Sequence, residues 1–194
     1  MKSQPKSLIE LSNYVDFGVR LAFKGRPILL KVLEHFGERV KLNFAFYSNH
    51  PDNPEFITGS RAVIAASFQG KLWEFDNLLR SQKESFTEDL VIRLAEELGL
   101  DKEKFIEDFH SDRVDARLKK DAEKASTLGL TISPALTING HIYRGALDED
   151  ALIEAIEGSI VMPVGKAVED FIHWGASAAF ALLSAAVLAL LFVN

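Results

Sequence analysis

The sequence predicts an α/β body followed by one apolar helix at the C-terminus. Strand-like and helix-like hydrophobic patterns alternate within residues 1–157 in the order β-α-β, a helical block, then a β-hairpin and a helix. After Asp170 the chain carries no further formal charge and is almost wholly apolar. We therefore expect a folded domain at residues 1–157, a linker at residues 158–167 and a transmembrane helix at residues 168–194.

The first part of the body predicts two strands joined by a helix. Residues 8–17 mix β-branched and aromatic side chains with polar ones, which is typical of a strand. From Gly18 to Gly37 apolar side chains recur at helical spacing, and Pro27 is expected to kink this helix or to mark its restart. Residues 40–46 alternate apolar and polar side chains and predict the second strand.

The remainder of the body is expected to be mostly helical and to close with a hairpin. The helical region from about residue 55 to residue 128 is broken at Gly70, near Ser85, at Gly99 and near Ser111, and helices are expected to start at Thr87 and Asp101. Residues 135–144 predict two strands of a hairpin, because Asn139-Gly140 favours a type I′ turn. Residues 148–157 predict a closing amphipathic helix.

The composition excludes several classes of protein. The 194 residues are 47% hydrophobic and 26% charged, unlike collagen-like or wholly disordered chains. A net charge of −6 argues against nucleic acid as a partner. The absence of cysteine excludes disulfides, thiolate metal sites and thiol nucleophiles. No phosphate-binding, dinucleotide or zinc-hydrolase motif occurs, so we expect no cofactor and no metal.

Three stretches of the body resemble the DsbA-like thioredoxin-fold family. They are FQGKLWE at residues 68–74, AEELGLD at residues 95–101 and TISPALTING at residues 131–140, which are similar to the family's "QGKFWE", "AEELGLD" and "(S/T)PTFxING" stretches. They follow the family's order and spacing, and the resemblance covers residues 8–157. It implies a thioredoxin-like fold with a helical insertion, in which Ser133-Pro134 forms a cis-proline loop.

The resemblance also implies that the family's redox site has been lost. Members carry a Cys-x-x-Cys pair at the start of the first helix, after an aromatic-rich strand that NYVDF at residues 13–17 resembles. The four motif positions fall on Val19, Arg20, Leu21 and Ala22. Because Val19 and Ala22 stand at the two cysteine positions, we expect no oxidoreductase activity and no catalytic residue, although a helix N-terminus is still expected there.

The cis-proline loop has two interpretations. In active relatives this loop holds extended peptide by backbone hydrogen bonds, so the resemblance implies a peptide-binding edge at Ser133 and Pro134. Otherwise Pro134 only shapes the edge of the strand.

Other polar pairs favour structural roles. His50 and Asp52 are two potential metal ligands without a third, which favours turn residues over a metal site. Asp16 is either a remnant of the buried acid of active relatives or an ordinary polar residue at the end of a strand. A carboxylate pair of Asp16 with Glu34 would require a tertiary contact.

The C-terminal residues predict a membrane span with a packing surface. Residues 171–194, as a helix, would extend over roughly 36 Å, compared with a hydrocarbon core of about 30 Å. The alternative, a buried core helix, usually keeps a polar stripe. Small residues follow one another at every fourth position, at Ser177, Ala181, Ala185 and Ala189. This row favours a partner helix over a simple anchor, and the tail faintly resembles the first span of NhaA-type Na+/H+ antiporters.

These features lead to one main functional hypothesis and two alternatives. No secretory signal is visible at the N-terminus, so we expect a single-pass protein of the bacterial inner membrane with its body in the cytoplasm. The main hypothesis is a redox-inactive accessory subunit that contacts the lipid bilayer and integral membrane proteins through its C-terminal helix. The alternatives are a tethered peptide-binding or chaperone module, and a glutathione-dependent enzyme with a non-cysteine site.

Overall fold

The computed structural model describes residues 8–19 and 25–161. Contacts divide the chain into two compact units, Met1–Leu152 and Ile153–Asn194. Within the described ranges, no helix combines the length and the apolar character that a membrane crossing requires. The predicted span at residues 168–194, with its row of small residues, lies outside the described residues.

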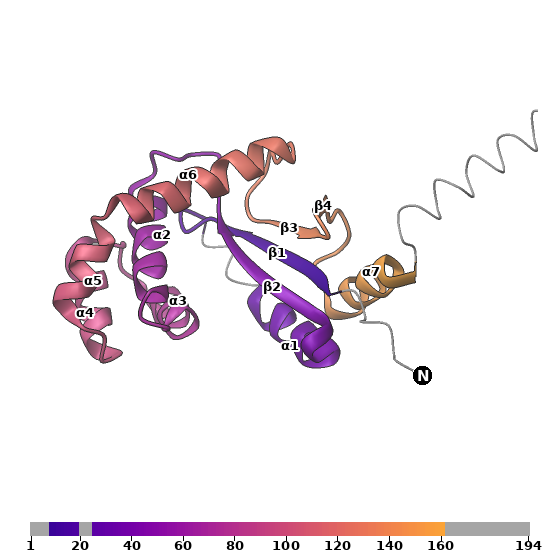
Figure 1. Ribbon diagram of the computed structural model, residues 1–194, viewed down its shortest axis with the longest axis horizontal. Helices are drawn as coiled ribbons and strands as arrows, with labels where there is room; N and C mark the ends of the chain where they lie inside the picture. The colour runs from indigo at the N-terminus through magenta and orange to yellow at the C-terminus, as the bar shows by residue number, and fades with distance from the viewer. Residues whose placement is uncertain (1–7, 20–24, 162–194) are drawn as a thin grey trace, which may run out of the picture. The chain divides into compact units, whose positions relative to one another are not determined.

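The elements follow the predicted order of β-α-β, a helical block, a hairpin and a helix (Figure 1). In chain order they are β1 (Ile9–Val15), α1 (Arg26–Phe36), the 3₁₀ turn η2 (Gly37–Arg39), β2 (Val40–Phe46), α2 (Pro54–Ser67), α3 (Leu72–Ser81), α4 (Glu88–Glu97), α5 (Lys102–Phe109), α6 (Asp112–Thr127), β3 (Ala135–Ile138), β4 (His141–Ile142) and α7 (Glu149–Val161).

The four strands form one mixed sheet in the order β2-β1-β3-β4. β1 runs parallel to β2, with Val15 opposite Phe46, because α1 returns the chain to the same edge. β3 runs antiparallel to β1, with Tyr14 opposite Ala135, and continues through a hairpin into β4. This topology, with its helical insertion between β2 and β3, is the thioredoxin-like arrangement that the sequence predicts.

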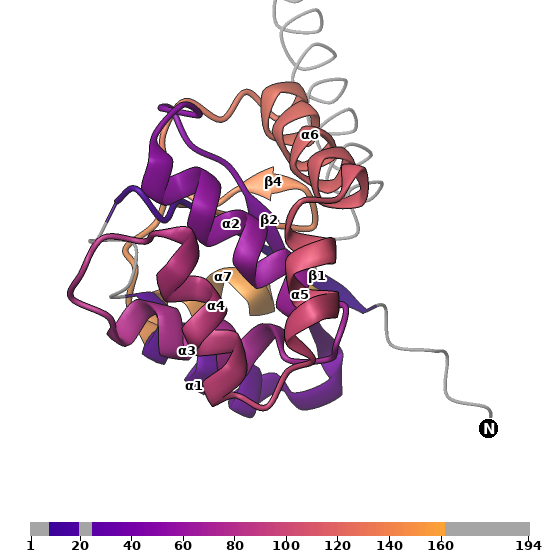
Figure 2. The ribbon, with the colours of Figure 1, turned by 90° about the vertical axis from the view of Figure 1, so that its left-hand side faces the viewer.

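Helices cover the sheet at β2 and build a separate layer beside it. α1 and α6 contact β2 from opposite sides (Figures 1 and 2). α2 contacts α3, α4, α5 and α6 and is the central helix of the insertion. It passes very close to the end of β1, since a Cβ atom at Gly59 would lie 2.7 Å from the ring of Phe17. Gly59 therefore permits the contact between the insertion and the sheet.

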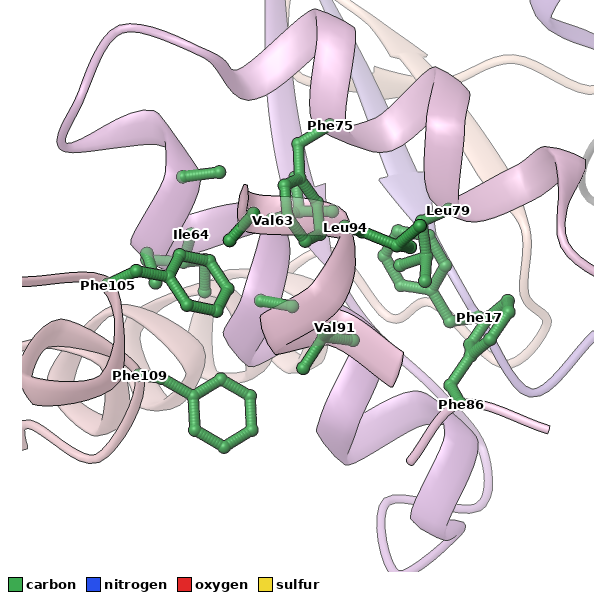
Figure 3. Packing of buried hydrophobic residues seen from close by; sticks show 14 of the residues in the cluster. Phe17, Val63, Ile64, Phe75, Leu79, Phe86, Val91, Leu94, Phe105 and Phe109 are labelled. Carbon is green, nitrogen blue, oxygen red and sulfur yellow. The ribbon is translucent and has the colours of Figure 1, made fainter. Parts of the chain in front are cut away.

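Aromatic side chains connect the sheet to the insertion (Figure 3). The Phe17 ring stacks on Phe46 of β2 and meets Phe86 edge-on, with both pairs of ring centroids 6.2 Å apart. Deeper in the insertion, Phe75 stacks on Phe105 at 5.4 Å. All five rings are buried, and burial of this apolar area is the main term that stabilises the two layers together.

The boundaries of the helical block confirm the predicted start and stop signals. The side chains of Thr87, Asp101 and Ser111 accept hydrogen bonds from the first turns of α4, α5 and α6. Gly70 and Gly99 adopt positive φ angles of 75° and 69° where helices end. The hairpin turn forms at Asn139-Gly140 as predicted, with φ angles of 50° at Asn139 and 80° at Gly140. The strand β4 is shorter than expected, because it ends at Ile142 and not at residue 144.

Two helix boundaries differ from those expected. α1 begins at Arg26 and not at Gly18, and Gly18 and Val19 are not helical. Pro27 occupies the first turn, where the missing N–H has no cost, so it marks the start of the helix rather than a kink. α7 continues through the first residues of the predicted linker as far as Val161, the last residue that the structure describes.

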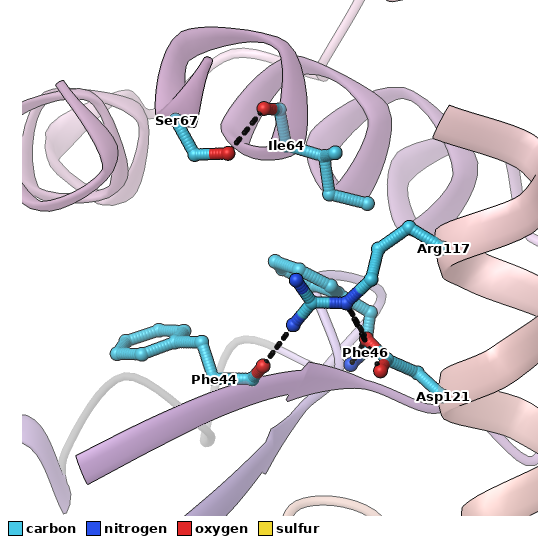
Figure 4. A network of polar contacts seen from close by, with 6 residues as sticks. All are labelled: Phe44, Phe46, Ile64, Ser67, Arg117 and Asp121. Carbon is cyan, nitrogen blue, oxygen red and sulfur yellow. Dashed lines mark hydrogen bonds and ion pairs between the residues drawn. The ribbon is translucent and has the colours of Figure 1, made fainter. Parts of the chain in front are cut away.

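The open edge of β2 is closed by two side chains of α6 (Figure 4). The Asp121 carboxylate accepts a hydrogen bond from the backbone N–H of Phe46 at 3.1 Å. Arg117 donates to the carbonyl of Phe44 and pairs with Asp121, its Nε lying 3.0 Å from Oδ2. Since β2 pairs with β1 alone among the strands that the structure describes, these contacts satisfy backbone groups that would otherwise face the helix unpaired.

We expect Asp121→Ala to lower the free energy of unfolding by about 2–4 kcal/mol, because it leaves the buried Phe46 N–H without an acceptor and Arg117 without its partner. Asp121→Asn keeps an acceptor oxygen and should cost less. Urea unfolding followed by far-UV circular dichroism measures both. Glu123→Ala on the same helix, where the side chain is 66% exposed, is the matched control. Equal losses for Asp121→Ala and Glu123→Ala would show that α6 does not close the edge in this way.

Candidate functional site

The site lies where β1 ends beside the start of β3. Asp16 follows the last residue of β1 and is 1% exposed. Its Oδ1 accepts the backbone N–H of Gly18 at 2.9 Å, and its Oδ2 accepts the hydroxyl of Ser133 at 2.6 Å. The antiparallel register explains this meeting: Tyr14 lies opposite Ala135, so two residues further on Asp16 reaches Ser133.

The predicted cis-proline loop is confirmed, since the Ser133–Pro134 peptide bond is cis. Pro134 is half-buried and immediately precedes β3. The hydrogen bond between Ser133 and Asp16 fixes the loop against the end of β1. Asp16 is therefore the group that holds the loop, a role that neither sequence interpretation assigned to it.

Of the four positions of the degenerate motif, the structure describes Val19. It is half-buried, and its N–H donates to the carbonyl of Asp16 at 3.4 Å. Its aliphatic side chain carries no group that exchanges protons or electrons. Arg20, Leu21 and Ala22 lie outside the described residues. Val19 itself is not helical, and the described helix α1 begins at Arg26.

The other polar pairs do not form sites. Glu34 is exposed on α1, whereas the buried Asp16 carboxylate is bonded to Gly18 and Ser133. His50 and Asp52 are both exposed in the loop before α2. In the described part of the chain, no group of three or more potential metal-ligating side chains comes together.

A pocket of about 250 Å³ lies beside Pro134. It is enclosed by the first turns of α1, by α3, by the strands β1, β2 and β3, and by the segment that follows β4. Apolar side chains form most of its wall, namely Leu29, Leu30, Phe44, Trp73, Ile132, Pro134, Ala135, Leu136, Ile142 and Leu147. Pockets of this kind, concave and apolar with a few polar groups, are typical ligand sites.

A buried ionic cluster forms one end of the pocket. The Asp76 carboxylate on α3 is fully buried and lies between two guanidinium groups. Arg80 donates from Nε to Oδ1 at 2.8 Å, and Nη1 of Arg26 pairs with Oδ2. The Arg26 guanidinium also lies over the Trp73 ring, 4.8 Å from its centroid.

Burial dominates the electrostatics of this cluster. It lowers the pKa of Arg80 to about 10. It also lowers the pKa of Arg26 to about 10, with a smaller contribution from the positive charge of Arg80. Both side chains remain charged at neutral pH. The sequence analysis missed the cluster, and its only local signal is the spacing of four residues between Asp76 and Arg80 on an apolar helix face.

The chain matches a known domain family over most of its length. Residues 15–157 match the family model described as the DSBA-like thioredoxin domain. The crystal structure of a thioredoxin-like oxidoreductase from Silicibacter pomeroyi superposes with a TM-score of 0.71 at 21% identity, over 82% of this chain and 90% of that one. At this identity the superposition shows the fold alone.

Two relatives are named as Na+/H+ antiporters. NhaA 1 of Mycolicibacterium gilvum is 29% identical over 159 residues, which are 81% of this chain and 26% of the antiporter. NhaA of Nitrosospira multiformis is 27% identical over 191 residues, which are 97% of this chain and 30% of the antiporter. The chain thus spans less than a third of the length of either relative.

We expect Asp16→Ala to lower the free energy of unfolding by about 2–3 kcal/mol, because the Gly18 N–H and the Ser133 hydroxyl both lose their acceptor. Ser133→Ala leaves the bond to Gly18 and should cost about 1 kcal/mol. Thermal unfolding of the full chain in a mild detergent measures both. Asp52→Ala, at an exposed carboxylate, should change little. If Asp16→Ala is no more harmful than Asp52→Ala, the loop is held by other contacts.

Proposed function

Because the chain belongs to the DSBA-like thioredoxin domain family and contains no cysteine, we propose that it is a redox-inactive module of a Na+/H+ antiporter system in the bacterial inner membrane. In this proposal the thioredoxin-like body is on the cytoplasmic side, and the C-terminal residues attach it to the bilayer and to an integral membrane protein. In this proposal the module acts as an accessory subunit, and the chain corresponds to 26% and 30% of the length of the two antiporters.

One observation carries the proposal. The match with the Nitrosospira multiformis antiporter covers 97% of this chain, so it extends beyond the body into the apolar C-terminal sequence. A match restricted to the body would indicate only a shared thioredoxin-like domain. A match that continues through both parts supports a shared arrangement of domain and membrane segment.

The chemistry of the site supports the redox-inactive part of the proposal. Disulfide exchange requires a thiolate, and Val19 and Ala22 stand where the family has its cysteines. The Asp16 carboxylate, next to the motif, is engaged with Ser133 and Gly18. It supports the loop rather than a reacting group, in agreement with the rule that a fold does not determine an activity.

The cis-proline loop supports a second candidate, a tethered peptide-binding module. Ile132, next to Ser133 and Pro134, is 64% exposed and precedes a strand of the sheet. An extended peptide could pair with such a segment by backbone hydrogen bonds.

We expect the chain, solubilised in mild detergent, to co-purify stoichiometrically with an antiporter of the same organism. Ala181→Leu with Ala185→Leu should abolish most of this association while leaving the protein in the membrane fraction, because larger side chains separate the helix backbones. Leu183→Ile with Leu190→Ile, off the small row, is the matched control. Recovery of the chain alone, or with varied client proteins, would contradict the accessory role and favour the second candidate.

We also expect no reduction of insulin disulfides and no oxidation of reduced peptides by the purified chain, because it has no thiol. Insulin turbidity in the presence of dithiothreitol measures the reduction, with an active DsbA-like oxidoreductase as the positive control. Turnover above the rate of dithiothreitol alone would overturn this part of the proposal.

A further inference from the structure

The pocket beside Pro134 has an excess of positive charge. Its described lining contains three guanidinium groups, of Arg26, Arg80 and Arg144, and one carboxylate, of Asp76. The Asp76 side chain is fully buried, and those of Arg26 and Arg80 are only 12% and 9% exposed. Among the described lining groups, guanidinium groups therefore outnumber carboxylates at the buried end, where little water is present to solvate them.

Arg26 has hydrogen-bonding capacity that the described residues do not use. Its Nη1 pairs with Asp76, and its Nη2 donates to the carbonyl of Trp73 over a long 3.5 Å. Its Nε has no acceptor within the described part of the chain. A guanidinium group has five N–H donors arranged to match a carboxylate, so an anion entering the pocket would meet a suitable partner.

The opening of the pocket is unusually apolar for an exposed surface. Three of the five large hydrophobic residues that are exposed in the described chain line this one pocket: Leu30 at 47%, Ile132 at 64% and Leu147 at 46%. Trp73 and Phe44 continue the apolar wall inward, with ring centroids 4.7 Å apart in an edge-to-face contact. Exposed apolar side chains gathered at one concave place are typical of a binding site.

We propose that this pocket binds a small organic carboxylate with an apolar or aromatic body. The carboxylate accepts hydrogen bonds from Arg26, and the body packs against the wall that Trp73 forms. An inorganic anion would leave the apolar wall in contact with water, and a neutral apolar molecule would leave the excess charge uncompensated. The volume of about 250 Å³ selects a small molecule. This binding is independent of the proposed attachment to an antiporter.

The chemistry of the ligand is tested with 3-phenylpropionate, titrated into the full chain in phospholipid nanodiscs and followed by calorimetry, with empty nanodiscs as the blank. We expect saturable binding. Removing the charge, in 3-phenylpropan-1-ol, should weaken it by about tenfold or more, because the hydrogen bonds to a charged group are lost. Removing the apolar body, in acetate, should also weaken it by about tenfold or more, because the contacts with the apolar wall are lost. Absence of saturable binding by 3-phenylpropionate, or equal binding of the alcohol, would overturn the proposal.

Whether the ligand binds in this pocket is tested by placing a negative or a positive charge at one exposed residue of its opening. Ile132→Glu should weaken 3-phenylpropionate binding about fivefold through repulsion at the opening, whereas Ile132→Lys should not weaken it. The side chain is 64% exposed, so neither change disturbs the core. Ile57→Glu, on α2 and outside this pocket, should leave binding unchanged. Equal affinities of the two Ile132 variants would overturn the assignment of the pocket.

Arg26→Gln tests the buried end directly and should weaken binding about tenfold. If this variant does not fold, as the loss of a partner of buried Asp76 allows, the Ile132 pair decides the question alone. A folded Arg26→Gln variant that binds 3-phenylpropionate as tightly as the natural chain would show that the carboxylate is recognised elsewhere.

Discussion

The buried carboxylate of Asp76 is the constraint on which the arrangement around the pocket depends. It joins the first turn of α1, through Arg26, to α3, through Arg80. The Arg80 guanidinium also lies over the ring of Phe17, 5.0 Å from its centroid, at the end of β1. One carboxylate thus connects the strand-and-helix part of the fold to the helical insertion. Without it, two buried positive charges would repel each other at the same place, which is costly in a medium of low dielectric constant.

The region around Pro134 contains two buried polar groups, the carboxylate of Asp16 and the ionic cluster around Asp76, which have different roles. Asp16 uses both oxygens for groups within the protein, the Gly18 N–H and the Ser133 hydroxyl, and so contributes to the shape of the cis-proline loop. The arginine cluster places two guanidinium groups around the single carboxylate of Asp76. The fold of this chain therefore presents an apolar-walled pocket whose described lining has more guanidinium groups than carboxylates, and the described residue of the degenerate motif, Val19, is aliphatic. In such a site recognition is possible where thiol chemistry is not.

Local patterns in the sequence were sufficient for the strands, the hairpin turn and the helix caps, because each depends on neighbouring residues. The resemblance to a family supplied the cis bond at Pro134. Neither the local patterns nor the family resemblance predicts contacts between residues that are far apart in the sequence. The bond from Asp16 to Ser133 depends on the register of β3 against β1, and the pairing of Arg26 with Asp76 depends on how closely α1 approaches α3. The start of α1 at Arg26 differs from the predicted start at Gly18, because the apolar periodicity of the sequence continues across Pro27.

The central claim is that Arg26 and Arg80 are both buried and share one carboxylate. Nuclear magnetic resonance of the arginine Nε–H groups, with the full chain in micelles, tests it most directly, because buried guanidinium protons exchange slowly with water. The account predicts slow exchange of the Nε–H signals that Arg→Lys substitution assigns to Arg26 and Arg80, and loss of this protection in Asp76→Ala. Exchange of both signals at the rate of an exposed arginine such as Arg93, whose side chain is 64% exposed, would contradict it.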